Sequence, residues 1–155
     1  MSDTPPSRHL IGTLLVSAQF ALILGLGMLA AKAVAKGLTP LGAWWFAVAG
    51  VMVGLWSLVH NRPGNFNIRP APRDDGQLFQ TGPYRWIRHP MCTAVIAVGL
   101  ACAWTGASVL GWAALSLLVV VLAVKANFQE RWLRKAHPGY AAYCQQTRRF
   151  LPGIY

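Results

Sequence analysis

The sequence has few acidic residues. Four Asp and Glu stand against fourteen Lys and Arg in a chain of 155 residues, which argues against a metal centre built from several carboxylates. The three cysteines are odd in number and have no CxxC spacing, so they indicate no disulfide framework. The sequence also contains no P-loop, no glycine-rich nucleotide fingerprint, and no GxSxG or HExxH motif. We therefore expect no metal site and none of the chemistries that those motifs carry.

Charge of either sign is also scarce. Only 12% of the residues are charged, 55% are hydrophobic, and the mean hydropathy is +0.41. This composition is typical of a membrane protein and not of a soluble domain. The sequence predicts an all-α fold over residues 1–155: a single, polytopic membrane domain with about four transmembrane helices and a C-terminal amphipathic helix.

Four apolar stretches supply the expected spans. Residues 10–31 and 41–59 are each long enough to cross a hydrocarbon core of about 30 Å, given a rise of 1.5 Å per residue. The later apolar region is too long for one span and long enough for two short ones, broken by a Thr-Gly-Ala-Ser segment. It predicts a helical hairpin with arms at about 88–104 and 108–125.

Basic residues gather in two segments, the loop 60–87 and the tail 126–155. The positive-inside rule places both segments, and with them both termini, in the cytoplasm. We expect an integral, multi-pass protein, in the inner membrane if the chain is bacterial. Membrane lipids are the expected partners, and nucleic acid is not, because no recognition motif is present.

The block Gly82–Pro90, with sequence GPYRWIRHP, lies where the polar loop meets the third apolar stretch. Arginine and histidine are costly beside a bilayer unless they bind an anionic group or perform a task. Proline at position 90 suits the first turn of a helix, so Arg85, Arg88 and His89 would sit at a helix N-terminus, which attracts anions. The alternative is that these residues only set the topology.

Glu130 is the only acidic residue after Asp75. It falls in a segment whose apolar and charged residues alternate with helical spacing, which predicts an amphipathic helix at the cytoplasmic surface. Glu130 either pairs with Arg134 one turn further on or faces inward, where it would accept hydrogen bonds or neutralise a cationic ligand.

The end of the tail is rich in aromatic and basic residues, in the segments GYAAY at 139–143 and RRFLPGIY at 148–155. Two interpretations remain open from the residues alone. Tyrosine and arginine form interfacial belts at membrane surfaces, and such a segment can also fold as a lid over a cofactor beside His89.

Taken together, the segments GPYRWIRHPM, KANFQERWL, GYAAY and RRFLP resemble the isoprenylcysteine carboxyl methyltransferase family in order and spacing. The resemblance covers Gly82 to Pro152. It implies an integral-membrane methyltransferase that uses S-adenosylmethionine, bound between the RHP block and the tail near the cytosolic face. It also implies a lipid-embedded or hydrophobic substrate, such as an isoprenylcysteine carboxylate, a phospholipid amine or a thiol.

The resemblance assigns roles to individual residues. Glu130 matches the second acid of the family's paired Glu motif, and Arg149 matches the arginine before the terminal Leu-Pro, where it would bind a carboxylate; both are expected to be catalytic. The residues expected to bind the cofactor are Tyr84, Arg85, Arg88, His89, Pro90, Glu130, Tyr140 and Tyr143.

Three positions depart from the family pattern: Cys92, Gln129 and Gln146, where a tyrosine, a glutamate and an arginine are usual. These departures favour the alternative of a non-catalytic membrane scaffold that has kept the fold. The tail also resembles that of NADPH-dependent sterol reductases, a second enzymatic alternative. In that group, however, the RHP segment usually continues with Asn-Tyr.

Overall fold

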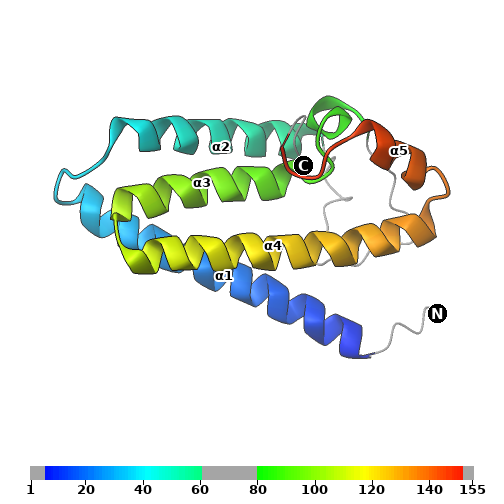
Figure 1. Cartoon of the computed structure of the whole chain (residues 1–155), viewed down its shortest axis with the longest axis horizontal. Helices are drawn as coiled ribbons and strands as arrows, with labels where there is room; N and C mark the ends of the chain where they lie inside the picture. Colours follow the sequence, from blue (N-terminus) through cyan, green and yellow to red (C-terminus); the bar gives the residue numbers. More distant parts are fainter. Residues whose placement is uncertain (1–5, 61–79, 152–155) are drawn as a thin grey trace.

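A computed structural model of the chain describes residues 6–60 and 80–151, and Figure 1 shows its helices. The parts of the expected loop and tail at 61–79 and 152–155, and residues 1–5, lie outside the described residues. Within the described part there is no β-strand, and the expected all-α fold is confirmed. The helices are α1 (Pro6–Val34), α2 (Leu41–His60), the short 3-10 helix η1 (Gly82–Arg85), α3 (Pro90–Gly106), α4 (Val109–Ala136) and α5 (Tyr140–Gln146).

The largest difference from expectation is in α4. The sequence predicts a span ending at residue 125 and a separate amphipathic helix after it, whereas α4 continues without a break to Ala136. No proline or glycine occurs between Gly111 and Pro138, so nothing interrupts the backbone hydrogen bonds at the membrane edge. The amphipathic segment is therefore the polar end of α4, and α5 is a further helix.

The other expected spans agree with the structure to within a few residues. The helices α1, α2 and α4 are each long and apolar enough to cross a membrane, and α3 is a shorter apolar helix of 17 residues. The third helix, α3, begins at residue 90, two residues after the start of the expected span, because the fixed backbone angle of Pro90 suits the first helical position. The chain is an integral membrane protein.

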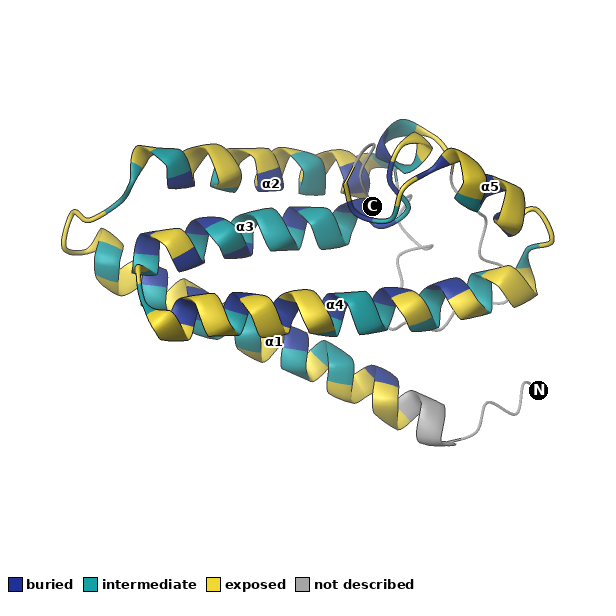
Figure 2. Cartoon of the chain, viewed as in Figure 1, coloured by how far each residue is buried: buried dark blue, intermediate teal, exposed yellow. Residues whose placement is uncertain are grey.

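Helix α3 is central in the bundle, since it packs against α1, α2 and α4. Although α3 is short, these neighbouring helices shield it from the surroundings. Much of the outward surface of α2 and of α4 is exposed, as Figure 2 shows. Its large residues on α2, and on α4 from Val109 to Val120, are apolar, as is usual for a lipid-facing surface. The core lies between α1, α3 and α4 around Leu26, Leu118 and Leu122.

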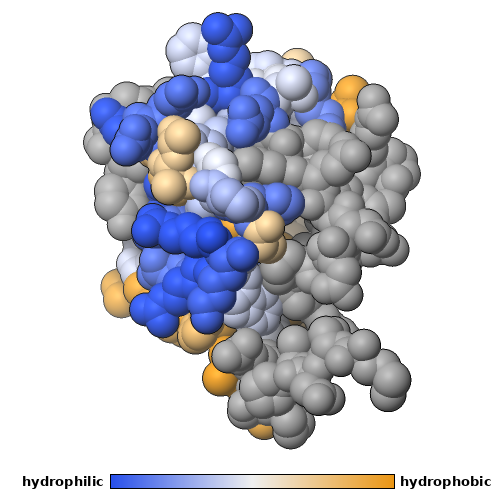
Figure 3. All heavy atoms as spheres, turned by 90° about the vertical axis from the view of Figure 1, so that its right-hand side faces the viewer, coloured by the Kyte–Doolittle hydropathy of each residue, from blue (hydrophilic) through white to orange (hydrophobic). Residues whose placement is uncertain are grey.

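The α2–α3 contact depends on small residues. A Cβ atom on Gly50 would lie 2.8 Å from a methyl group of Val98 and 2.9 Å from the carbonyl oxygen of Ala94. The two backbones can approach this closely only because Gly50 has no side chain. This packing brings the C-terminal end of α2 against η1, at the end of the bundle where hydrophilic side chains gather (Figure 3).

Candidate functional site

The RHP block and the C-terminal tail meet at this hydrophilic end. Ile87 and Arg148 form an isolated parallel bridge. The backbone N–H of Arg88 donates to the carbonyl of Arg148 (2.8 Å), and that of His89 donates to the carbonyl of Arg149 (3.1 Å). These bonds pair two segments about sixty residues apart in sequence, so the positions of Arg88 and Arg149 are coupled through the backbone.

Side chains reinforce this pairing. The hydroxyl of Thr93, in the first turn of α3, donates to the carbonyl of Phe150 at 2.6 Å. The ring of Phe150 lies 5.9 Å from that of His89. The hydroxyl of Tyr143 donates to the carbonyl of Tyr84. The tail is therefore packed onto the RHP block.

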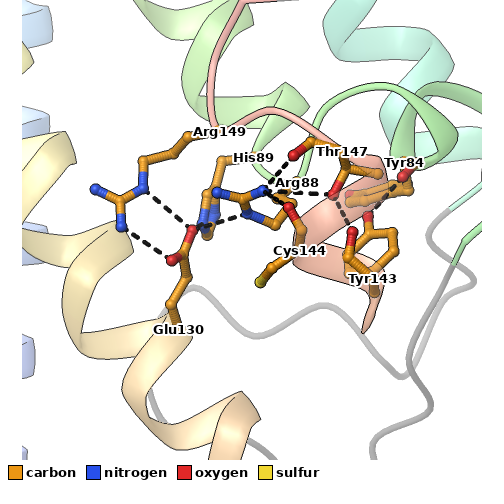
Figure 4. Close-up of polar contacts among 8 residues, drawn as sticks. All are labelled: Tyr84, Arg88, His89, Glu130, Tyr143, Cys144, Thr147 and Arg149. Carbon is orange, nitrogen blue, oxygen red and sulfur yellow. Dashed lines mark hydrogen bonds and ion pairs between the residues drawn. The ribbon is translucent and has the colours of Figure 1, made fainter. Parts of the chain in front are cut away.

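Glu130 is the centre of the site, as Figure 4 shows. Glu130 is only 3% exposed. Its Oε1 accepts from Arg88 Nε (3.1 Å), His89 Nε2 (3.1 Å) and Arg149 Nε (3.1 Å), and its Oε2 accepts from Arg149 Nη2 (2.9 Å). Of the two interpretations from sequence, the inward-facing one agrees with this geometry, since all these partners lie on other segments and Arg134 is exposed.

Arg88 also binds the end of α5. Its Nη1 donates to the carbonyl oxygens of Cys144 (3.1 Å) and Thr147. The guanidinium thus joins three parts of the chain: the start of α3, the polar end of α4 and the segment after α5. Arginine can do this because its rigid fork presents five N–H donors.

The charges of the cluster do not cancel. Burial lowers the pKa of His89, an effect that outweighs its hydrogen bond to Glu130. The imidazole is then neutral at pH 7 and donates through Nε2–H, because a carboxylate can only accept. Arg88 and Arg149 carry two positive charges against one negative charge on Glu130. The cluster therefore has a net positive charge suited to an anionic group.

Tyrosine hydroxyls border the cluster. Burial raises the pKa of Tyr140 and Tyr143, and raises that of Tyr84 to about 12, so all three are protonated donors at neutral pH. Tyr140 is 1% exposed, and its buried hydroxyl makes no hydrogen bond to the described part of the chain. A buried donor without a partner is costly. It marks a place where a ligand's acceptor would fit.

The structure brings together most of the residues singled out from the sequence. Pro90 is buried at the first position of α3, which fixes the orientation of His89. Arg85 is different: it is exposed on η1 and takes no part in the hydrogen bonds around Glu130. Sequence reasoning missed Thr93 and Thr147, because they act on backbone carbonyls whose position no sequence pattern reveals.

The positions that depart from the family pattern lie around the cluster and not in it. Gln129 is half-buried next to Glu130, and Gln146 is exposed at the end of α5. Cys92 is half-buried in the first turn of α3. The Glu130 contacts form without any of these three side chains.

A family model places this helical membrane protein among the methyltransferases. The model for phospholipid methyltransferases matches residues 40–138, more than half of the chain. The chain belongs to this family, which is the family of isoprenylcysteine-methyltransferase-like integral-membrane enzymes, so the resemblance described above is confirmed. No curated protein and no solved structure matches the chain. The matched region spans α2, α3 and α4 and includes Glu130, whereas Arg149 lies beyond it.

Proposed function

We propose that the protein is an S-adenosylmethionine-dependent methyltransferase for a lipid-embedded or hydrophobic substrate, with its cofactor site at the Glu130 cluster. One observation carries the proposal. Arg88 and His89 of the RHP block and Arg149 of the tail converge on the buried carboxylate of Glu130, on α4, at the membrane boundary. Ionisable groups are rarely placed together at such a boundary without a functional reason. Family membership supplies the reaction type, since the family consists of methyltransferases acting on lipid-like substrates.

The residues present fit this cofactor. S-adenosylmethionine carries a carboxylate, an ammonium group and ribose hydroxyls. Arg88 and Arg149 are cationic donors of the kind that bind a carboxylate, and Glu130 supplies an acceptor for an ammonium or a hydroxyl group. The hydroxyl of Tyr140, which has no hydrogen-bond partner among the described residues, supplies a further donor. We assign cofactor binding to these four residues together with His89, Tyr143 and Tyr84.

When bound, the cofactor supplies an activated methyl group on a sulfonium. The protein's own contribution is alignment and exclusion of water, which account for much of the rate increase in a displacement reaction. Glu130 fixes both guanidiniums, and neutral His89 holds Glu130 through Nε2–H. The packed tail, with Phe150 against the His89 ring, shields the cluster from solvent.

We further propose that the hydrophilic end in Figure 3 faces the cytoplasm, with both termini on that side. The excess of basic residues in the loop after α2 and in the segment after residue 125 supports this orientation. Accessibility of engineered single cysteines near either terminus, probed with a membrane-impermeant thiol reagent in oriented vesicles, checks it. Labelling from the external side would contradict the orientation.

Titration calorimetry on the detergent-purified protein tests the cofactor. We expect binding of S-adenosylmethionine and S-adenosylhomocysteine but not of NADPH. Binding of NADPH alone would support the reductase alternative. Binding of none of the three would favour the scaffold. Transfer of a labelled methyl group from S-adenosylmethionine into a lipid extract would then identify the acceptor.

Two adjacent arginines provide a matched pair for the same titration. Arg149→Gln removes a bidentate partner of Glu130 and should weaken S-adenosylhomocysteine binding by about 10- to 100-fold, since a hydrogen bond to a charged group contributes about 1.5–3 kcal/mol. Arg148→Gln changes the exposed neighbour and should leave the affinity within about twofold. If both variants lost affinity for S-adenosylhomocysteine to the same extent, the Glu130 cluster would not be the cofactor site.

A further inference from the structure

A second polar contact lies deeper in the bundle. Lys125 on α4 donates through Nζ to Oε1 of Gln19 on α1 at 2.9 Å. Gln19 is only 8% exposed and Lys125 is half-buried. Both residues fall within helices that are long and apolar enough to cross the membrane. An ionisable residue in this setting is expensive to keep and indicates a functional site.

Lys125 has no ionic partner in the described part of the chain. Glu130 is the only acidic residue there, and its two oxygens bind Arg88, His89 and Arg149. The contact with Gln19 uses one of the three N–H donors of the ammonium group. Two donors and a full positive charge thus remain for a group that the described chain does not supply. An anionic oxygen is the chemistry that matches them.

The position of Lys125 relates it to the Glu130 cluster. The two residues are five positions apart on α4, or about 7.5 Å along the helix axis at 1.5 Å per residue. Lys125 is the deeper of the two, since Glu130 is nearer the polar end of the helix. An anion bound at Lys125 would therefore lie on the membrane side of the proposed cofactor site, where a lipid-borne methyl acceptor has to be.

An apolar cavity of about 230 Å³ lies between α1, α2 and α3, and its lining on α1 begins at Ile23, one helical turn after Gln19. Its α1 lining residues, Ile23 and Leu26, follow Gln19 at helical spacings of four and seven, so all three share a face. On α3, Met91 and Val95 line the cavity. A cavity of about 150 Å³ holds benzene, so by proportion this one holds roughly nine carbon atoms.

We propose that Lys125 and Gln19 bind the anionic group of the methyl acceptor, while part of its hydrocarbon chain occupies the cavity lined by Ile23, Leu26 and Val95. The proposal rests on the function proposed above and names the substrate class: an amphiphile with a phosphate or carboxylate headgroup. Charge complementarity selects an anionic headgroup, and the wholly apolar lining residues select a hydrocarbon chain.

The test measures binding, so it does not depend on turnover. The full-length protein in phosphatidylcholine nanodiscs is titrated with decyl phosphate, decanoate and decanol. We expect decanol to bind at least tenfold more weakly than the better of the two anions. The ratio of the anions shows whether a phosphate or a carboxylate is preferred. S-adenosylhomocysteine is titrated in parallel. If the protein does not bind it, the proposed function fails, and this outcome is independent of whether the anions bind.

Four variants make the test specific. Lys125→Met should weaken binding of the preferred anion about tenfold or more, and Lys125→Arg should restore most of it. Lys135→Met removes the same charge from an exposed position on α4 and should have little effect. Gln19→Met removes the interhelical hydrogen bond but keeps the cation, so it should weaken binding less than Lys125→Met. All four should keep the affinity for S-adenosylhomocysteine within about twofold.

The cavity is tested by Val95→Phe, which fills it without changing charge. We expect about fivefold weaker binding of decyl phosphate or decanoate, whichever is preferred, and unchanged affinity for S-adenosylhomocysteine. The proposal is overturned by equal binding of decanol and the anions, by equal effects of Lys125→Met and Lys135→Met, or by equal effects of Gln19→Met and Lys125→Met. In the last case the pair only joins α1 to α4.

Discussion

Helices α2 and α4 are both long apolar helices, but they differ in the residues that they bury. The buried residues of α2 are small, Ala43, Gly50 and Ser57, and much of its remaining surface is apolar and exposed. The buried residues of α4 run through Leu115, Leu118, Leu122 and Ala126 to Glu130. Helix α2 buries small residues in its contacts with neighbouring helices. Helix α4 continues its buried face beyond its apolar part, and the last buried residue on that face is Glu130.

Because of this difference, the contacts of α2 contribute to stability, whereas those at the polar end of α4 contribute also to the candidate site. Contacts of α2 with α3 are van der Waals contacts, made close by small residues such as Gly50 and extended by the rings of Phe46 and Trp104, and they hold the helices together in lipid. Contacts of the polar end of α4 are charge-assisted hydrogen bonds to the RHP block and the tail. Substitutions in α2 should therefore change stability without changing the affinity for the cofactor. Substitutions at Glu130 should change both.

The largest effect should come from Glu130→Gln. The amide has the same shape but leaves Arg88 and Arg149 without their counter-charge, and breaking a buried ion pair in this way costs about 3–5 kcal/mol. We expect a clearly lower thermal unfolding temperature in detergent, together with loss of S-adenosylhomocysteine binding and of methyl transfer. Unfolding followed by tryptophan fluorescence, and calorimetric titration, measure the two effects.

The control for this variant is Arg134→Gln, which changes an exposed charge one turn further along α4. It should alter stability by no more than about 0.5 kcal/mol. A Glu130→Gln protein with unchanged stability and ligand affinity would show that the cluster neither anchors the tail nor binds the cofactor.

The second prediction addresses the α2–α3 contact. Gly50→Ala places a Cβ 2.9 Å from the backbone oxygen of Ala94, so the helices have to move apart, at a cost of about 1–3 kcal/mol. Affinity for S-adenosylhomocysteine should change by less than about twofold. Gly54→Ala is the matched control, since its Cβ would meet Ala94 Cβ at an ordinary 3.5 Å. Equal destabilisation by the two variants would contradict the close-packing argument.

Much of the architecture could be predicted from the sequence because hydropathy and helix length are local properties. The spans, the short α3 and the small residues at its contacts all follow from such patterns. The inward orientation of Glu130 also has a local signal. It follows Leu122 and Ala126 at intervals of four residues, which places it on the buried face.

The remaining features depend on contacts between distant segments. The bridge between Ile87 and Arg148 and the hydrogen bond from Thr93 to Phe150 use backbone groups, which every residue carries and no motif marks. The continuation of α4 to Ala136 could not be predicted for a related reason. A change from apolar to polar residues shows where a membrane surface lies, but a helix stops only where its backbone hydrogen bonds are interrupted.

The third prediction concerns pH and His89. Burial holds the pKa of His89 below its ordinary value of 6.5, so the unfolded chain binds more protons than the folded one once the pH falls below about 6.5. Stability should therefore decrease on acidification from pH 7.5 to 5.5, by at most about 1.4 kcal/mol for this one group, since one pKa unit corresponds to about 1.4 kcal/mol. Unfolding temperatures at the two pH values measure the effect. A His89→Gln variant that kept the full decrease would assign it to another group.

The smallest effect should come from Tyr143→Phe, which tests how strongly the tail is held on the RHP block. The variant keeps the buried ring but loses the hydroxyl that donates to the carbonyl of Tyr84, a change of about 1 kcal/mol. Because this bond fixes α5 and not Glu130, we expect faster amide hydrogen exchange in residues 140–151 with little change in exchange along α3 and α4.

Tyr140→Phe is the control variant. The hydroxyl of Tyr140 has no hydrogen bond to the described chain, so its removal should leave the exchange rates unaltered and weaken the affinity for the cofactor. Faster exchange in α4 for the Tyr143 variant would contradict this expectation and show that the tail and the Glu130 cluster form one cooperative unit.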